Sequence, residues 1–156
     1  MGNLEGNRES TSVIENIKNI LEKVYPRYKI ERIGGSKEEK HGIDVLVTIS
    51  GLSNLEKYNI AIQVKNYKGE ISDYNIDNII KQINKAEEYG WENDGKLINK
   101  ILVVSPAKEV ENPKLIKECK KENIKIIFSE ELKKLIFQSI IESIDWKEIF
   151  DEMLQE

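Results

Sequence analysis

Hydrophobic residues recur at every third or fourth position in two segments of the chain, which is the spacing of one face of an α-helix. Residues 13–24 predict the first helix, with Ser10, Thr11 or Ser12 as its N-cap. Residues 73–89 predict the second helix, which Gly90 ends. Each apolar stripe is expected to cover a hydrophobic surface. The stripe of the first helix consists of Val13, Ile14, Ile17, Ile20, Leu21 and Val24.

Three further segments alternate apolar and polar residues in the manner of half-buried strands. They span residues 28–33, 43–50 and 58–66, and turns that contain glycine separate them. Two short aliphatic runs, 100–107 and 124–129, are typical of strands that are covered on both faces.

Helical spacing returns in the second half of the chain. Residues 112–123 predict a short helix, and residues 130–155 predict two more helices at the end. The complete order is helix, three strands, helix, strand, helix, strand, helices. This order predicts an α/β fold in which a mixed sheet is flanked by helices on both faces. We expect one domain over residues 1–156, with its core at 13–128. The helices at 130–155 either complete this core or form a homodimer interface.

Composition restricts the class of protein. A chain of 156 residues with 39% hydrophobic and 33% charged side chains is typical of a globular domain. No run of about eighteen apolar residues occurs, so no membrane span is expected. The single cysteine, Cys119, excludes an internal disulfide and favours a reducing, cytoplasmic location.

Charge is unevenly distributed. The chain has a net charge of −4, but its last 28 residues carry eight acidic and three basic side chains, a local net of −5. The preceding residues therefore have a net charge of +1. Residues 23–41 and 114–125 are locally basic. This distribution permits a nucleic-acid partner, although mixtures of Lys and Glu are more often plain solvated surface.

Three polar residues interrupt the two strands at 43–50 and 58–66. Strand alternation places Ile43, Val45, Val47 and Ile49 on one face and Asp44, Leu46 and Thr48 on the other. In the next strand, Ile60, Ile62 and Val64 form an apolar face, which leaves Ala61, Gln63 and Lys65 opposite. The odd residues Asp44, Gln63 and Lys65 thus fall on the faces that are not purely aliphatic.

The hairpin register is expected to bring these three residues together. If residues 50 and 58 flank the loop, Asp44 lies opposite residue 64, between Gln63 and Lys65. A register shifted by one residue in either direction still leaves Asp44 opposite or diagonal to both. Gly42 leaves room there for a close approach of backbone or phosphate. The alternative is a polar rim on a half-exposed hairpin, with Asp44 paired to Lys65 and Gln63 solvated.

A carboxylate, an amide and an ammonium at one point have a specific chemical use. Mg²⁺ takes oxygen ligands and retains several waters, so a carboxylate and an amide oxygen can hold it against a phosphate. A nearby ammonium can orient water and offset charge in the transition state of phosphodiester hydrolysis. The chain contains no P-loop, paired-cysteine or HExxH motif that would suggest other chemistry.

The pattern Gly42-Ile43-Asp44 followed by Gln63-Val64-Lys65, with a helix before it and an αβ unit after it, resembles the PD-(D/E)XK nuclease superfamily. It is most similar to the Mrr-type restriction endonuclease branch, in which Gln commonly replaces the Glu of the ExK step. The resemblance covers residues 13–128. It implies a restriction-endonuclease-like fold and an endonuclease that hydrolyses DNA with Mg²⁺ or Mn²⁺. By this resemblance Asp44 and Gln63 are metal ligands and Lys65 is the catalytic lysine.

Members of the superfamily often use another acid from the first helix, where this chain has Glu15. A helical projection places Glu15 opposite the apolar stripe, and a capping box with Ser12 explains it, so we leave it out of the site. The site then has one carboxylate, which predicts weak metal binding or loss of cleavage. Two alternatives stay open: a Holliday-junction resolvase-like nuclease, built as a dimer through the C-terminal helices, and a non-catalytic nucleic-acid-binding or scaffold protein.

Overall fold

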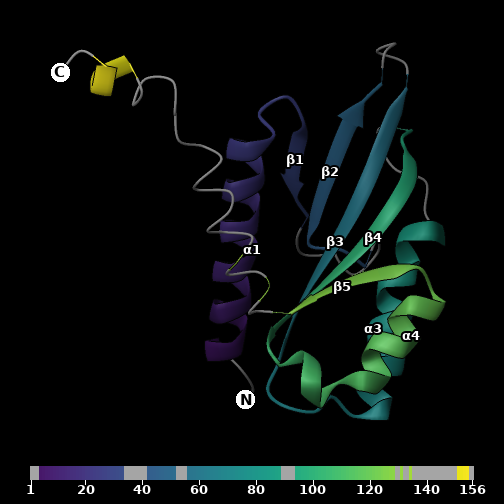
Figure 1. The fold of residues 1–156 in the computed structure, drawn as a ribbon. Coiled ribbons are helices and arrows are strands. Elements are labelled where there is room, and N and C mark those ends of the chain that lie inside the picture. The colour runs from purple at the N-terminus through teal and green to yellow at the C-terminus, as the bar shows by residue number, and fades with distance from the viewer. Residues whose placement is uncertain are drawn as a thin grey trace.

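A five-stranded sheet with the order β1-β2-β3-β4-β5 forms the centre of the computed structural model (Figure 1). The structure describes residues 4–33, 42–51, 56–88, 94–128, 131, 134 and 151–154. The first three strands are antiparallel, and β3, β4 and β5 are parallel to one another. The predicted α/β class with a mixed sheet flanked by helices is therefore confirmed.

The elements follow the predicted order through β5. The strands are β1 (Lys29–Arg32), β2 (Val45–Ser50), β3 (Lys57–Tyr67), β4 (Lys96–Pro106) and β5 (Ile124–Phe128). The helices are α1 (Leu4–Val24), α3 (Asp73–Glu88), the short 3-10 helix η1 (Glu109–Glu111) and α4 (Pro113–Lys121). Residues 131, 134 and 151–154 are helical, and the rest of the predicted C-terminal helices lie outside the described residues. None of the helices in the described ranges is long and apolar enough to cross a membrane.

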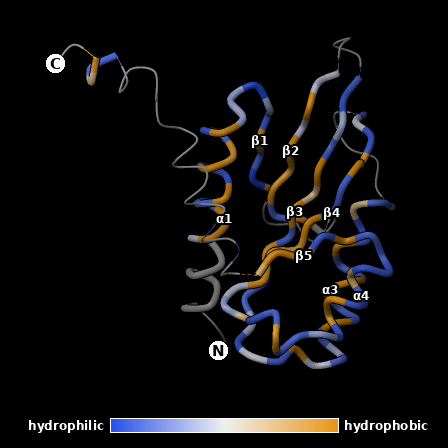
Figure 2. The backbone as a smooth tube through the Cα atoms, viewed as in Figure 1, coloured by the Kyte–Doolittle hydropathy of each residue, from blue (hydrophilic) through white to orange (hydrophobic). Residues whose placement is uncertain are grey.

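Helix α1 covers one face of the sheet, and α3 and α4 cover the other (Figure 1). The core on the α1 face consists of Ile14, Ile17, Ile30, Val45, Val47, Ile62, Val64 and Val103. On the second face, α3 and α4 pack on alternate residues of β4, including Leu102 and Val104. Strand β4 is thus apolar on both faces, as its continuous aliphatic run predicts. Figure 2 shows hydrophobic residues along the middle of the strands.

Cys119 belongs to the core under α4 and is fully buried. Burial raises the pKa of its thiol to about 11, because the charged thiolate loses its hydration there. The thiol therefore stays protonated at neutral pH and packs as a small apolar group.

The start of α1 differs from the prediction. The helix begins at Leu4, so Ser10, Thr11 and Ser12 lie inside it and are not its N-cap. The predicted capping box between Ser12 and Glu15 is therefore wrong. Glu15 instead forms an ion pair with Arg32 of β1. The position of this carboxylate depends on Arg32, a partner on β1 that a local sequence pattern cannot reveal.

The register of β2 against β3 is also one residue away from the prediction. Val45 pairs with Ile62, and Ser50 pairs with Lys57, because β3 begins one residue earlier than expected. In this register Val45 and Val47 lie beside Ile62 and Ile60, so the apolar residues of both strands share the α1 face. The predicted register would have set Val45 against Gln63. Burial of one shared face therefore decides the register.

Candidate functional site

Asp44 connects three neighbouring segments of chain at the point where β2 begins. Its backbone amide donates to the carbonyl of Ile62 at 2.8 Å, and its carbonyl accepts from the amide of Ile33 at 2.7 Å. Its carboxylate oxygen Oδ2 accepts from the amide of Val64 at 2.7 Å. The side chain is only 2% exposed. The carboxylate thus serves as an acceptor for β3, and such charge-assisted bonds are short and strong.

The residue before Asp44 departs from the predicted alternation. We expected Ile43 on the face of Val45 and Val47, but it is buried with Leu46 and Ala61 against Ala86 of α3. Regular pairing starts only at Val45. Gly42 precedes this point with a φ of +69°, a left-handed value that turns the chain. The strand pattern therefore fails where the backbone leaves the extended conformation.

Gly42 lies against the backbone of α3. A Cβ at this position would lie 1.8 Å from the carbonyl oxygen of Gln82 and 3.2 Å from the Cβ of Lys85. The close approach that the sequence predicts at Gly42 is thus made by a protein backbone. It brings α3 next to the segment that leads into Asp44. Lys85 was not predicted near the site, although it follows Gln82 at the three-residue spacing of one helix face.

Gln63 lies in the next strand and is 1% exposed. It precedes Val64, whose backbone amide donates to the Asp44 carboxylate, so Gln63 is a direct chain neighbour of the residue that Asp44 binds. The Gln63 amide nitrogen donates to the carbonyl of Val64 at 3.3 Å. Its oxygen Oε1 is buried without a hydrogen-bond donor.

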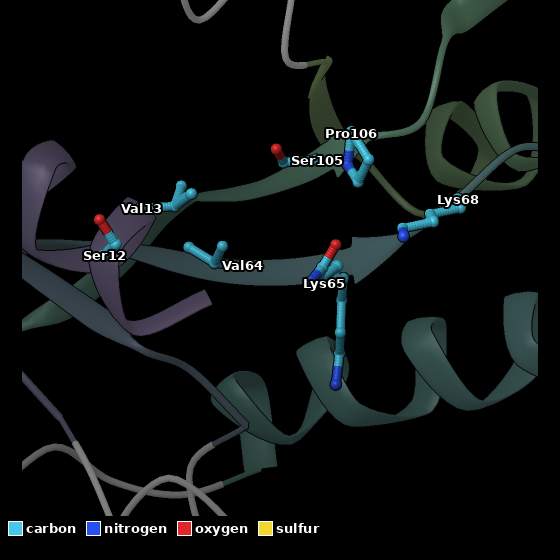
Figure 3. A pocket seen from close by; sticks show the side chains of 8 residues that line it. Ser12, Val13, Val64, Lys65, Lys68, Ser105 and Pro106 are labelled. Carbon is cyan, nitrogen blue, oxygen red and sulfur yellow. The ribbon is translucent and has the colours of Figure 1, made fainter. Parts of the chain in front are cut away.

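Lys65 shares the strand parity of Ala61 and Gln63, so its side chain leaves the sheet on the α3 face. Figure 3 shows its ammonium pointing toward a helix in the colour of α3. The residue is half-buried, and its strand position pairs with Val104 of β4. Asp44 is thus hydrogen-bonded to Val64, and Gln63 and Lys65 are the residues on either side of Val64 in β3. Glu15 lies on the other side of the sheet, against Arg32.

The donors at this point suit a hard cation better than a soft one. Within the described ranges, no three His, Cys, Asp or Glu side chains are grouped so that they could hold a metal. A cation here would depend on Asp44 and on amide or carbonyl oxygens. Mg²⁺ and Mn²⁺ accept such oxygens. The Gln63 oxygen would be the second side-chain donor beside the Asp44 carboxylate.

Comparisons of the chain with protein-family models, with curated proteins and with solved structures give no match.

We predict that Gly42→Ala lowers the free energy of unfolding by about 3 kcal/mol or more, because the new methyl group would overlap the backbone of α3. Gly69→Ala is the matched control: its φ is +68°, but the nearest atom to its Cβ is 4.0 Å away. It should lose only about 1 kcal/mol, from left-handed strain. Urea denaturation measures both values, and equal losses would contradict the close approach.

A second prediction concerns the buried oxygen of Gln63. A buried acceptor without a donor costs about 1–3 kcal/mol. Gln63→Met removes it at similar volume, so we expect the metal-free protein to unfold at equal or higher free energy, by up to about 1 kcal/mol. The half-buried Gln82 provides the control, since Gln82→Met should change stability by less than about 0.5 kcal/mol. A loss above about 1 kcal/mol for Gln63→Met would show that the amide stabilises the fold.

Proposed function

We propose that this protein is a metal-dependent endonuclease that hydrolyses phosphodiester bonds of DNA, with an Mrr-type restriction-endonuclease-like fold. The observation that carries the proposal is the buried oxygen of Gln63, which has no hydrogen-bond donor and belongs to the residue before Val64, the residue whose amide the Asp44 carboxylate accepts. Proteins rarely retain such an orphaned acceptor, and its cost is explained when a ligand satisfies it. Two oxygen donors with an ammonium nearby suit a cation and a phosphate.

Each residue has a role in this proposal. The Asp44 carboxylate is the main ligand of Mg²⁺ or Mn²⁺, and its bond to the Val64 amide fixes its orientation. Gln63 is the second ligand through Oε1. When bound, the metal would polarise the phosphoryl group and supply an activated water. Lys65, two residues along the strand, would place its ammonium beside the phosphate, where it offsets negative charge that grows in the transition state.

The architecture supports the same proposal. The resemblance to PD-(D/E)XK nucleases implies a helix, three strands, a helix and a further strand, and α1 through β4 have this order. Asp44 precedes the second strand, and Gln63 and Lys65 belong to the third. The residues that the resemblance assigns to the site therefore lie just before one strand and within its neighbour.

One observation favours a second function, a nucleic-acid-binding protein that does not cleave. The carboxylate of Asp44 already has a structural use, because it accepts the Val64 amide at 2.7 Å and is almost completely buried. This bond accounts for an aspartate in an apolar strand without a metal. With Gln at position 63, the pair has a single formal charge. Such a pair would bind a cation weakly.

The test is cleavage of supercoiled plasmid, linear duplex and four-way-junction DNA with Mg²⁺ or Mn²⁺. We expect activity that chelation abolishes. Asp44→Asn and Lys65→Ala should each lower the rate by about 100-fold or more, because each removes a charge from the transition state. Asparagine retains an acceptor for the Val64 amide, so the variant keeps that bond. Lys57→Ala is the control, since Lys57 is exposed at the opposite end of β3.

Two outcomes would contradict this assignment. Cleavage that persists in both Asp44→Asn and Lys65→Ala would show that the reaction occurs elsewhere or belongs to a contaminant. Absence of cleavage together with intact, salt-dependent DNA binding would favour the non-catalytic function. Preference for the four-way junction would identify a resolvase-like enzyme.

A further inference from the structure

A cavity of about 420 Å³ lies on the α1 face, where β3 and β4 end. We infer that it binds a phosphate group of the nucleic-acid strand on which the protein acts. The inference deepens the proposed function and takes the class of ligand from it. The cavity is lined by Ser12, Val13, Val64, Lys65, Asn66, Lys68, Ser105 and Pro106 (Figure 3).

The cavity and the candidate site occupy opposite faces of the same stretch of β3. Val64 connects them, because its backbone amide donates to Asp44 while the residue lines the cavity. Lys65 also contributes to the lining, but its ammonium points away from the labelled cavity residues and toward the α3 face (Figure 3). Val64 and Lys65 are thus shared by the candidate site and the lining of the cavity.

The lining is suited to an anion. Among the eight residues that form it none is acidic, and of its two lysines Lys68 is the one that supplies positive charge there, because the Lys65 ammonium points away (Figure 3). Ser12, Ser105 and Asn66 add side chains that can donate hydrogen bonds. Lys68 is exposed and directs its amine back along β3 in Figure 3. Positive charge combined with hydroxyl and amide donors is the usual composition of a protein contact to phosphate oxygens.

The volume also limits the ligand. Small-molecule sites commonly measure about 300–1,000 Å³, and this cavity falls at the lower end of that range. It can hold a phosphate with part of its sugars, but not a duplex. The contact would therefore be made to the backbone and would position the strand without reading its sequence.

The turn that carries Lys68 is held in place by a buried asparagine. Asn112 accepts from the amide of Ile71 at 2.9 Å and donates to the carbonyls of Gly69 and Lys108 at 3.1 and 2.8 Å. These bonds tie the segment after β3 to the segment after β4. The backbone next to Lys68 is therefore held in place before a ligand arrives, which lowers the backbone entropy cost of binding.

The experiment measures binding of fluorescent duplex DNA by anisotropy over a series of salt concentrations, with EDTA present to prevent cleavage. We expect Lys68→Ala to raise the Kd by about 3- to 10-fold and to lower the salt slope by about one phosphate contact. Lys68→Glu should raise the Kd further. Lys57→Ala and Lys57→Glu are the matched controls, because Lys57 is an exposed lysine at the other end of the same strand. Thermal unfolding of each variant checks that it is folded.

The binding measurement tests the phosphate site independently of whether the protein cleaves DNA. If Lys68→Glu binds DNA as tightly as the wild type, or if Lys57→Glu weakens binding as much, the cavity is not a phosphate site even where cleavage is intact. Absence of any salt-dependent DNA binding by the wild type would also overturn the inference. DNA binding that depends on Lys68, in a protein that does not cleave DNA, would support the phosphate site in the cavity and contradict the nuclease function.

Discussion

The bond between the Val64 amide and the Asp44 carboxylate determines how the rest of this region is built. It joins β3 to the residue before β2 with a side-chain oxygen at 2.7 Å, at the point where the regular ladder has not yet begun. A carboxylate can make this bond in a dry environment because the partner N–H offsets part of its lost hydration. A hydrophobic residue at position 44 would leave that amide without its carboxylate acceptor. The aspartate is therefore required by the backbone before any catalytic use is considered.

Several features of the surroundings follow from this arrangement. Gly42 turns the chain with a positive φ, so that the next residues enter between β1 and β3. Because Gly42 has no side chain, α3 can pack directly on it. The same geometry encloses Gln63, whose amide nitrogen has a partner while its oxygen has none. Close packing thus explains the fold of this region but not the orphaned oxygen. That oxygen is the feature on which the proposed metal site rests.

The sequence predicts most of the architecture because periodicity reports which faces are buried. The spacing of Ile76, Ile79 and Ile83 identifies α3, and the run from Ile101 to Val104 identifies a strand that is covered on both faces of the sheet. Element ends and register depend on interactions between distant residues. Helix α1 extends back to Leu4, and Glu15 contacts Arg32, which lies 17 residues away. Neither fact is encoded in a local pattern.

In the candidate site, too, periodicity predicts some features, while contacts between distant residues determine the others. Strand alternation predicts that Gln63 and Lys65 share a face, and their parity on β3 agrees with this. It does not predict that Ile43 leaves its face, because the turn at Gly42 interrupts the alternation. The position of Lys85 beside Gly42, and the positions of Ser12 and Ser105 in the cavity lining, depend on how α1 and α3 pack on the sheet. Only tertiary structure determines this packing.

The central claim is that the buried oxygen of Gln63 and the carboxylate of Asp44 hold one divalent cation. The most direct measurement is a titration of the protein with Mn²⁺, in which electron paramagnetic resonance reports the free ion. We predict one bound Mn²⁺ per chain, with affinity at least tenfold lower in Asp44→Asn and in Gln63→Met, and unchanged in Gln82→Met. Equal binding by wild type and all three variants, or no binding at millimolar Mn²⁺, would contradict the account.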